Sequence, residues 1–286
     1  MSDQSPGVSE RRISRRAAIG TGAALAGAAY LSRSSAVSAN RGVLMNQATP
    51  VPAGPPTVVF VHGAFADSSG WAGVISLLQA DGIQVLAASN PLRGVSIDSA
   101  YVASVVAAIP GPVLLVGHSY GGAVISGAAV GAANVVGLVY IAAFALDEGE
   151  GGLDVLGQFP PTLLASALRP ANADPANPDL LIDPAQYHEV FAADVPAEIV
   201  APMAFSQRPV LGSAFGEPAG AVAWKTLPSW FLIPTIDNVI GTEALRMFAA
   251  RAGSVTVEFE GASHAILISQ PVAVVDLIKS ALGTIA

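Results

Sequence analysis

A serine between glycines stands at the end of an apolar run, in a pattern typical of a nucleophile. The sequence GHSYGG at residues 117–122 follows PVLLV at 112–116 and precedes the small residues of 123–129. A strand that ends in G-x-S-x-G and turns at once into a helix strains the backbone of the serine and exposes its hydroxyl. The first N–H groups of the helix favour negative charge at the same point. The pattern predicts that Ser119 attacks a carbonyl group, with the side chain of His118 pointing away.

A serine nucleophile needs a base, and His264 is the best placed of four histidines. It follows the last predicted strand, where a loop can bring an imidazole to Ser119. Asp237 ends the apolar run 230–236 and precedes His264 in the chain, so we predict that it orients the imidazole. Asp147 is the alternative acid. The other histidines lie in a loop before the serine, in the serine motif and in a proline-rich insertion (His62, His118 and His188).

Acyl transfer also needs N–H donors directed at the developing oxyanion, each worth about 3 kcal/mol in the transition state. The run VVFVHGAF at 58–65 predicts a strand that ends in a His-Gly turn. We predict that the backbone N–H groups of Ala64 and Tyr120 form this oxyanion hole, with Phe65 as a second candidate donor. Several aromatic residues are predicted to line an apolar pocket for an uncharged acyl or aryl ester: Phe65, Trp71, Tyr120, Phe144, Phe159 and Trp224.

Short β-branched runs alternate with longer amphipathic segments from about residue 57, which predicts parallel strands joined by helices. The predicted strands are 57–61, 83–88, 113–117, 135–141, 230–236 and 255–259. The predicted helices are 69–80, 98–109, 120–131, 242–252 and 271–282. This order predicts an α/β fold with a mainly parallel sheet flanked by helices.

A proline-rich stretch interrupts this alternation between residues 147 and 228. Structureless loops of about 80 residues are rare in compact domains, so we predict a mainly helical cap, without a clear strand, inserted into the core. Helices are expected to begin at Asp183-Pro184 and Val195-Pro196. The core then comprises 57–146 and 229–286, and the cap comprises 147–228.

The first 39 residues differ from the rest of the chain. Four arginines precede an apolar run over 17–31, which is shorter than the roughly 20 residues that span a bilayer. The sequence SRRAAI at 14–19 resembles the twin-arginine signal family. Small residues at 37–39 are typical of a cleavage site before Asn40. We predict an export signal over 1–39 that uses the twin-arginine machinery, then an extended segment over 40–56 and a secreted or periplasmic protein.

The chain has no cysteine and a net charge of −8. Without cysteine it has no disulfide and no lipidated thiol, so we predict no stable membrane anchor once the signal is removed. Removing the arginine-rich signal makes the charge more negative. Such a surface repels phosphate backbones, which argues against nucleic-acid binding.

From about residue 55 the chain resembles the α/β-hydrolase superfamily. Its oxyanion turn is matched by HGAF at 62–65 and its nucleophile by the serine motif. Its acid and base are matched by Asp237 and His264, in the same chain order. The chain is especially similar to compact capped bacterial hydrolases and to plant methyl-ester esterases and hydroxynitrile lyases. The resemblance implies eight strands in full-length members. Too little chain precedes Thr57 for the first two, so about six are expected, and Pro234 indicates an edge or a bulge near the acid.

These features predict an exported serine hydrolase that cleaves a small-molecule carboxylic ester through an acyl-enzyme, with no metal or organic cofactor. A hydroxynitrile-lyase-like or acyltransferase or perhydrolase activity of the same triad is an alternative, as is a non-catalytic binding module. Lyases of this fold tend to add a lysine near the base, whereas Lys225 and Lys279 stand beside no triad candidate. Epoxide hydrolases and dehalogenases need a carboxylate where Ser119 stands.

Overall fold

A computed structural model describes residues 54–285. The predicted export signal over 1–39 and nearly all of the predicted segment over 40–56 lie outside the described residues. No helix within 54–285 combines the length and the apolar character that crossing a membrane requires.

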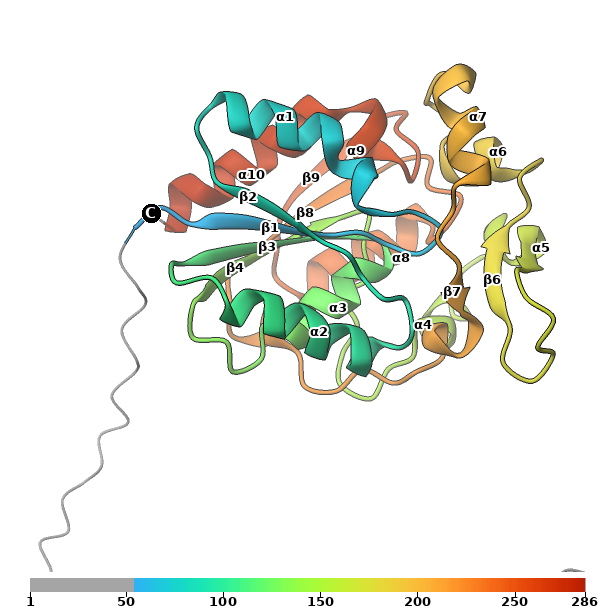
Figure 1. The fold of residues 1–286 in the computed structure, drawn as a ribbon, viewed down its shortest axis with the longest axis horizontal. Helices are drawn as coiled ribbons and strands as arrows, with labels where there is room; N and C mark the ends of the chain where they lie inside the picture. The colour runs from blue at the N-terminus through green and yellow to red at the C-terminus, as the bar shows by residue number, and fades with distance from the viewer. Residues whose placement is uncertain (1–53, 286) are drawn as a thin grey trace, which may run out of the picture. The chain divides into compact units, whose positions relative to one another are not determined.

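The centre of the fold is a six-stranded sheet of order β2-β1-β3-β4-β8-β9, in which all neighbouring strands are parallel (Figure 1). Its strands are β1 (Thr57–Val61), β2 (Val85–Ala88), β3 (Val113–His118), β4 (Val135–Ile141), β8 (Ser229–Pro234) and β9 (Val255–Phe259). The prediction of about six mainly parallel strands is therefore confirmed. Pro234 is the last residue of β8, between β4 and β9, so it marks the end of an interior strand instead of an edge.

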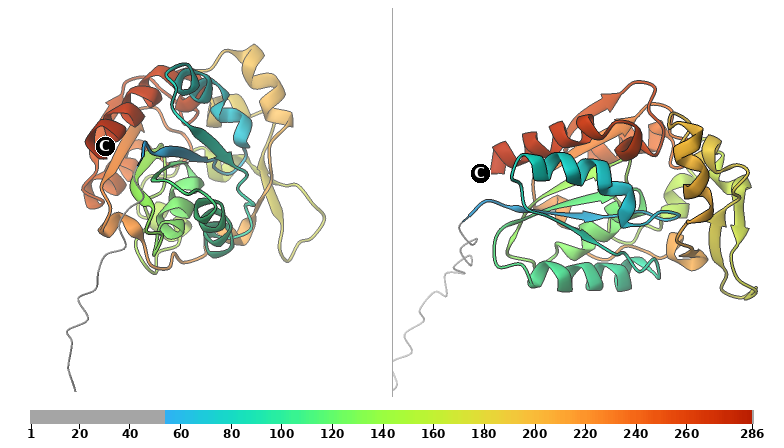
Figure 2. Two further views of the ribbon diagram at one scale, coloured as in Figure 1. Left: turned by 60° about the vertical axis from the view of Figure 1, so that its left-hand side comes forward. Right: turned by 45° about the horizontal axis from the view of Figure 1, so that its top comes forward.

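Helices cover both faces of this sheet (Figure 2). One face packs against α1 (Ala72–Ala80), α9 (Ile266–Ser269) and α10 (Pro271–Ile285), and a 3-10 helix, η1 (Ser68–Trp71), precedes α1. The other face packs against α2 (Val95–Ala107), α3 (Tyr120–Ala128) and α8 (Thr242–Arg251). Alternate residues of β1 belong to the two sides: Val58 and Phe60 to the first, Val59 and Val61 to the second. Burial on both faces explains why the strands read as continuous apolar runs.

The cap follows β4 and precedes β8, and it lies beyond the carboxyl ends of the parallel strands (Figure 1). Its helices are α4 (Gly152–Leu156), α5 (Leu164–Ala167), α6 (Tyr187–Phe191), α7 (Ala197–Phe205), η2 (Gly212–Phe215) and η3 (Ala223–Lys225). The helix expected from Val195-Pro196 is α7, whereas the one expected from Asp183-Pro184 begins later, at Tyr187.

The cap also contains three short strands that the sequence did not predict. They are β5 (Leu168–Pro170), β6 (Asp179–Ile182) and β7 (Val210–Leu211), and they form an antiparallel sheet of order β5-β6-β7. The expectation of a cap without clear strands was wrong, because strands of two to four residues are too short to show a period-two pattern.

Candidate active site

Ser119 occupies the strained turn between β3 and α3. Its backbone has φ 53° and ψ −125°, a conformation that L-residues rarely adopt. The turn is tight enough to exclude side chains on both flanks. A Cβ at Gly117 would lie 2.6 Å from the carbonyl oxygen of Gly121, and a Cβ at Gly121 would lie 2.4 Å from that of Val61. The glycines of the motif are therefore required by space, and they leave Ser119 at the cap side of the sheet.

His264 and Asp237 form a fully buried pair at the carboxyl ends of β9 and β8. His264 Nδ1 and Asp237 Oδ2 are 2.7 Å apart, and neither side chain is exposed. Oδ1 of the same carboxylate accepts the N–H groups of Val239 and Ile240, both at 2.8 Å, and that of Gly241 at 3.3 Å. Burial on its own raises the pKa of Asp237, but the charge of His264 and these hydrogen bonds outweigh it and lower that pKa. Asp237 therefore remains a carboxylate, and its Oδ2 accepts the proton on Nδ1 of His264.

The other ring nitrogen of His264 is left free for proton transfer. Nε2 is buried and has no hydrogen-bond partner within residues 54–285, so it is not bonded to the hydroxyl of Ser119. Hydrogen bonds between a nucleophile and its base are often long without substrate and shorten in the complex. A buried nitrogen without a partner is costly, and a catalytic role is one reason for which a protein retains one.

The turn after β1 brings backbone N–H groups close to Ser119. A Cβ at Gly63 would lie 2.6 Å from Ser119 Cβ, so the two chain segments are in contact. Phe65 has φ 62°, a conformation that residues other than glycine rarely adopt. Within the described residues, the N–H groups of Ala64 and Tyr120 have no backbone acceptor. Both N–H groups therefore remain available to an oxyanion formed at Ser119.

His62 and Asn90 hold this turn in place. His62 Nδ1 is 2.9 Å from the carbonyl oxygen of Gly63, and Nε2 accepts the N–H of Asn90 at 3.0 Å. The amide of Asn90 donates in turn to the carbonyl oxygen of His62 at 3.0 Å. Burial is the main cause that lowers the pKa of His62 and keeps the ring neutral. Asn90 was missed from the sequence, because it lies 28 positions from its partner in a loop without a motif.

His118, which precedes the nucleophile, contacts the loop of the base. Its Nε2 lies 3.0 Å from the carbonyl oxygen of His264, and the two imidazole rings are 4.7 Å apart. A carbonyl oxygen only accepts, so Nε2 carries the proton and donates. Burial, followed by the nearby charge of His264, lowers the pKa of His118 to about 3. The ring is therefore a neutral donor, and its hydrogen bond joins the turn that carries Ser119 to the loop that carries His264.

A cavity of about 400 Å³ lies over Ser119, between the core and the cap. Ser119 and Ala64 line it together, with Phe65 and Phe144 from the core. The remaining walls are mainly apolar and include Leu153, Leu156, Phe159, Leu164, Phe215, Val239 and Ile240. No Asp, Glu, Lys, Arg or His of the described residues lines this cavity. Its walls therefore suit an uncharged, apolar group.

Three of the predicted pocket residues, Trp71, Trp224 and Tyr120, do not line this cavity. Trp71 is fully buried on the opposite face of the sheet, 4.7 Å from the ring of Phe60, and does not border this cavity. Trp224 donates its indole N–H to the carbonyl oxygen of Leu146 and is likewise outside the lining. The hydroxyl of Tyr120 donates to the buried Asp98 at 2.9 Å. Sequence spacing cannot tell on which side of the sheet an aromatic ring packs, and Trp71 was misplaced for that reason.

The alternative acid, Asp147, lies away from His264. It forms an ion pair with Lys225 on the surface of the cap, and its side chain is 37% exposed. Within residues 54–285 no three histidine or acidic side chains are grouped as metal ligands.

The fold agrees with the comparisons to known proteins. The model of the alpha/beta hydrolase family matches residues 58–277. The chain belongs to this alpha/beta hydrolase family. The match covers all but the first residue of β1, the turn at Ser119, the cap and the loop of His264. Among curated proteins, no relative matches the sequence.

Solved structures with the same fold include several named as esterases or hydrolases. Polyneuridine aldehyde esterase has a TM-score of 0.68 and 19% identity, and the match covers 80% of this chain and 100% of that one. A pyrethroid hydrolase from Sphingobium faniae has a TM-score of 0.67 and 23% identity, with 80% and 97% covered. A methylesterase from Arabidopsis has a TM-score of 0.63 and 19% identity, with 80% and 99% covered. At these identities the likeness of this alpha/beta hydrolase to them concerns the fold.

Proposed function

We propose that this chain is a serine hydrolase that cleaves carboxylic esters through an acyl-enzyme. The observation that carries the proposal is the strained Ser119 at an apolar cavity, in a fold that also holds a buried His264–Asp237 pair. Nε2 of His264 has no hydrogen-bond partner among the described residues. A serine hydroxyl is activated by an imidazole that has a free nitrogen to take its proton and a tautomer fixed by a carboxylate. The strained backbone of the serine exposes that hydroxyl.

In the first half of the reaction, Ser119 Oγ attacks the ester carbonyl carbon while His264 Nε2 takes the hydroxyl proton. Asp237 stabilises the imidazolium that results. The oxyanion accepts the N–H groups of Ala64 and Tyr120, and its collapse breaks the bond to the alcohol oxygen, which receives the proton from Nε2. The alcohol leaves, and the acyl group remains esterified to Ser119.

In the second half, water replaces the alcohol. His264 Nε2 takes a proton from the water as its oxygen attacks the acyl carbon, and the bond to Ser119 Oγ then breaks. The proton returns to Oγ and a carboxylic acid is released. The apolar, uncharged walls of the cavity support an ester with an uncharged acyl or aryl group.

We also propose that the protein is exported by the twin-arginine machinery and acts as a secreted or periplasmic enzyme. The support is the sequence of residues 1–39, with its paired arginines and short apolar run. Replacing Arg15 and Arg16 by lysine in the full chain is expected to retain the protein inside the cell. An unchanged level of exported protein would contradict the assignment.

The direct test of the activity uses p-nitrophenyl esters from acetate to octanoate. We expect a burst of nitrophenolate that reports one acyl group per chain, followed by slower steady turnover. The Ser119→Ala variant is expected to lose the burst and nearly all turnover while keeping its fold. Turnover of the variant at the wild-type rate would contradict the proposal, and so would a folded wild-type protein that cleaves none of these esters.

A further inference from the structure

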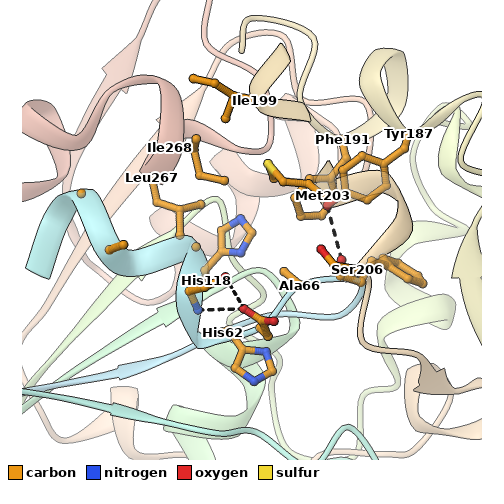
Figure 3. A pocket seen from close by; sticks show the side chains of 16 residues that line it. His62, Ala66, His118, Tyr187, Phe191, Ile199, Met203, Ser206, Leu267 and Ile268 are labelled. Carbon is orange, nitrogen blue, oxygen red and sulfur yellow. Dashed lines mark hydrogen bonds between the residues drawn. The ribbon is translucent and has the colours of Figure 1, made fainter. Parts of the chain in front are cut away.

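A second cavity, of about 330 Å³, lies beside the one at Ser119. Its walls come from the cap helices α6 and α7, from α9, from the turn after β1, and from η1 and the start of α1 (Figure 3). Among the described residues Phe65 alone borders both cavities, and neither Ser119 nor His264 borders the second one. A molecule bound in this second cavity would therefore not need to touch the serine.

The second cavity has mainly apolar walls and carries little charge. Its apolar lining includes Phe191, Ile199, Met203, Leu267 and Ile268. Asp67 is the one acidic residue in the lining, which contains no lysine or arginine. Oδ1 of Asp67 already accepts the N–H and the hydroxyl of Ser69, at 2.8 and 2.5 Å. The cavity therefore offers no cation to an anionic ligand, and an apolar, uncharged molecule suits it best.

Three side chains of the lining carry polar atoms on an aromatic ring, and those of His62 and Tyr187 are fully engaged. Both ring nitrogens of His62 have partners, as described above. The hydroxyl of Tyr187 lies 3.3 Å from the carbonyl oxygen of Phe65, to which it donates. His118 is the exception, because only its Nε2 is used, as a donor to the carbonyl oxygen of His264.

Nδ1 of His118 is therefore an acceptor that no described residue satisfies. The side chain is 1% exposed, and its ring borders the second cavity (Figure 3). Because Nε2 carries the proton and burial keeps the pKa of the ring near 3, Nδ1 has no proton at neutral pH. Nδ1 is not fully buried, so a molecule in the cavity can reach it. A ligand with an O–H group can donate a hydrogen bond to this nitrogen.

We propose that the second cavity binds a small uncharged alcohol or phenol, whose apolar part packs against Met203 and Leu267 and whose hydroxyl donates to His118 Nδ1. Ethers and ketones have no hydrogen to donate, and a protonated amine would bring a charge into an apolar wall. This binding requires neither an intact Ser119 nor any turnover, so it stands or falls separately from the proposed ester hydrolysis.

The test compares 4-propylphenol with 4-propylanisole, which has nearly the same shape but no donor. Titration calorimetry on the full chain is expected to give a dissociation constant about three- to tenfold lower for the phenol, the effect of one net hydrogen bond. Anisole binding as tight as phenol binding would overturn the proposal, and so would the absence of phenol binding.

Cavity-filling variants locate the site. Met203→Trp places an indole in the second cavity and is expected to weaken phenol binding at least tenfold. Phe205→Trp is the matched control, since Phe205 lies on the same helix, is 82% exposed and does not border the cavity. Leu156→Trp, which narrows the cavity at Ser119, is expected to leave phenol binding unchanged. Loss of binding in Leu156→Trp with none in Met203→Trp would place the phenol at Ser119 and overturn the proposal.

A spectroscopic measurement on the wild-type chain covers the case in which Met203→Trp does not fold. With ¹³C-methyl methionine, the methyl resonance of Met203 is expected to shift as 4-propylphenol saturates the protein. Met247 borders neither cavity and is expected to stay unchanged. A Met203 resonance that does not move at saturation would contradict binding in the second cavity.

Discussion

Gly63 and Ser119 are in direct contact across two loops of the core. A Cβ on residue 63 would lie 2.6 Å from Ser119 Cβ and 3.2 Å from its Oγ, and the carbonyl oxygen of His118 is 2.9 Å away. The turn that supplies the N–H of Ala64 thus packs directly against Ser119. Glycine at position 63 is required by this contact, whatever backbone angles the turn adopts.

The first prediction concerns this contact. Gly63→Ala is expected to push the turn away from Ser119 by up to about 1 Å. A displacement of that size lowers the rate of catalysis about 100-fold. Overpacking is expected to cost roughly 1–3 kcal/mol of the free energy of unfolding. Ester turnover and urea unfolding measure the two effects. Gly111→Ala is the control, because nothing lies within 4 Å of a Cβ at Gly111; equal turnover in the two variants would contradict the account.

The second prediction separates the two candidate acids. Asp237→Asn keeps the shape of the side chain but removes the charge that fixes the tautomer of His264, so kcat is expected to fall by about 10⁴. Asp147→Asn breaks only an ion pair at the surface and is expected to change kcat less than twofold. The measurement is steady-state hydrolysis of p-nitrophenyl acetate by both variants. Full activity of Asp237→Asn would exclude Asp237 as the orienting acid.

A third prediction concerns the length of the acyl chain of the ester substrate. Leu156 borders the cavity at Ser119, whereas Leu163, which also belongs to the cap, does not. Leu156→Trp is expected to lower kcat/KM for p-nitrophenyl octanoate at least tenfold and to leave that for the acetate within threefold, because only the longer acyl chain needs the filled space. Leu163→Trp is expected to behave as the wild type with both esters. A uniform loss with both esters would show that the acyl chain does not occupy this cavity.

The fourth prediction is a pH dependence of stability that arises from His118. The pKa of His118 is about 3 in the folded protein and about 6.5 in the unfolded chain. Between these values the unfolded state binds one more proton, so stability is lost as the pH falls, with a slope of about 1.4 kcal/mol per pH unit. His118→Gln cannot take up this proton, and its free energy of unfolding is expected to fall less steeply between pH 6 and 4. Urea unfolding across that range measures the difference, and identical slopes would show that His118 is not buried as a neutral ring.

The sequence predicted those parts of the molecule in which one local pattern decides the structure. The turn at Ser119 is such a case, because the apolar run, the glycines and the small residues after them are contiguous. The strands at 135–141 and 255–259 were predicted to the residue, since β-branched runs end there at clear turns. The six-stranded sheet followed from the alternation of such runs with helical segments.

Contacts between distant segments were not predictable in this way. His118 was expected to point away from Ser119, and nothing local indicated its bond to the carbonyl oxygen of His264, 146 positions later. Asn90 carries no motif, and its role depends on where β1 and β2 end in space. The antiparallel sheet of the cap was missed because strands so short are stabilised by their partners more than by their own residues.

The central claim is that Ser119 is the nucleophile of an ester hydrolase, and covalent labelling tests it most directly. The protein is treated with a fluorophosphonate, and the intact mass and the modified peptide are determined by mass spectrometry. We expect one adduct per chain, located on Ser119, with a rate that falls by orders of magnitude in the His264→Ala variant. A folded protein that remains unlabelled, or an adduct that persists unchanged in Ser119→Ala, would contradict the account.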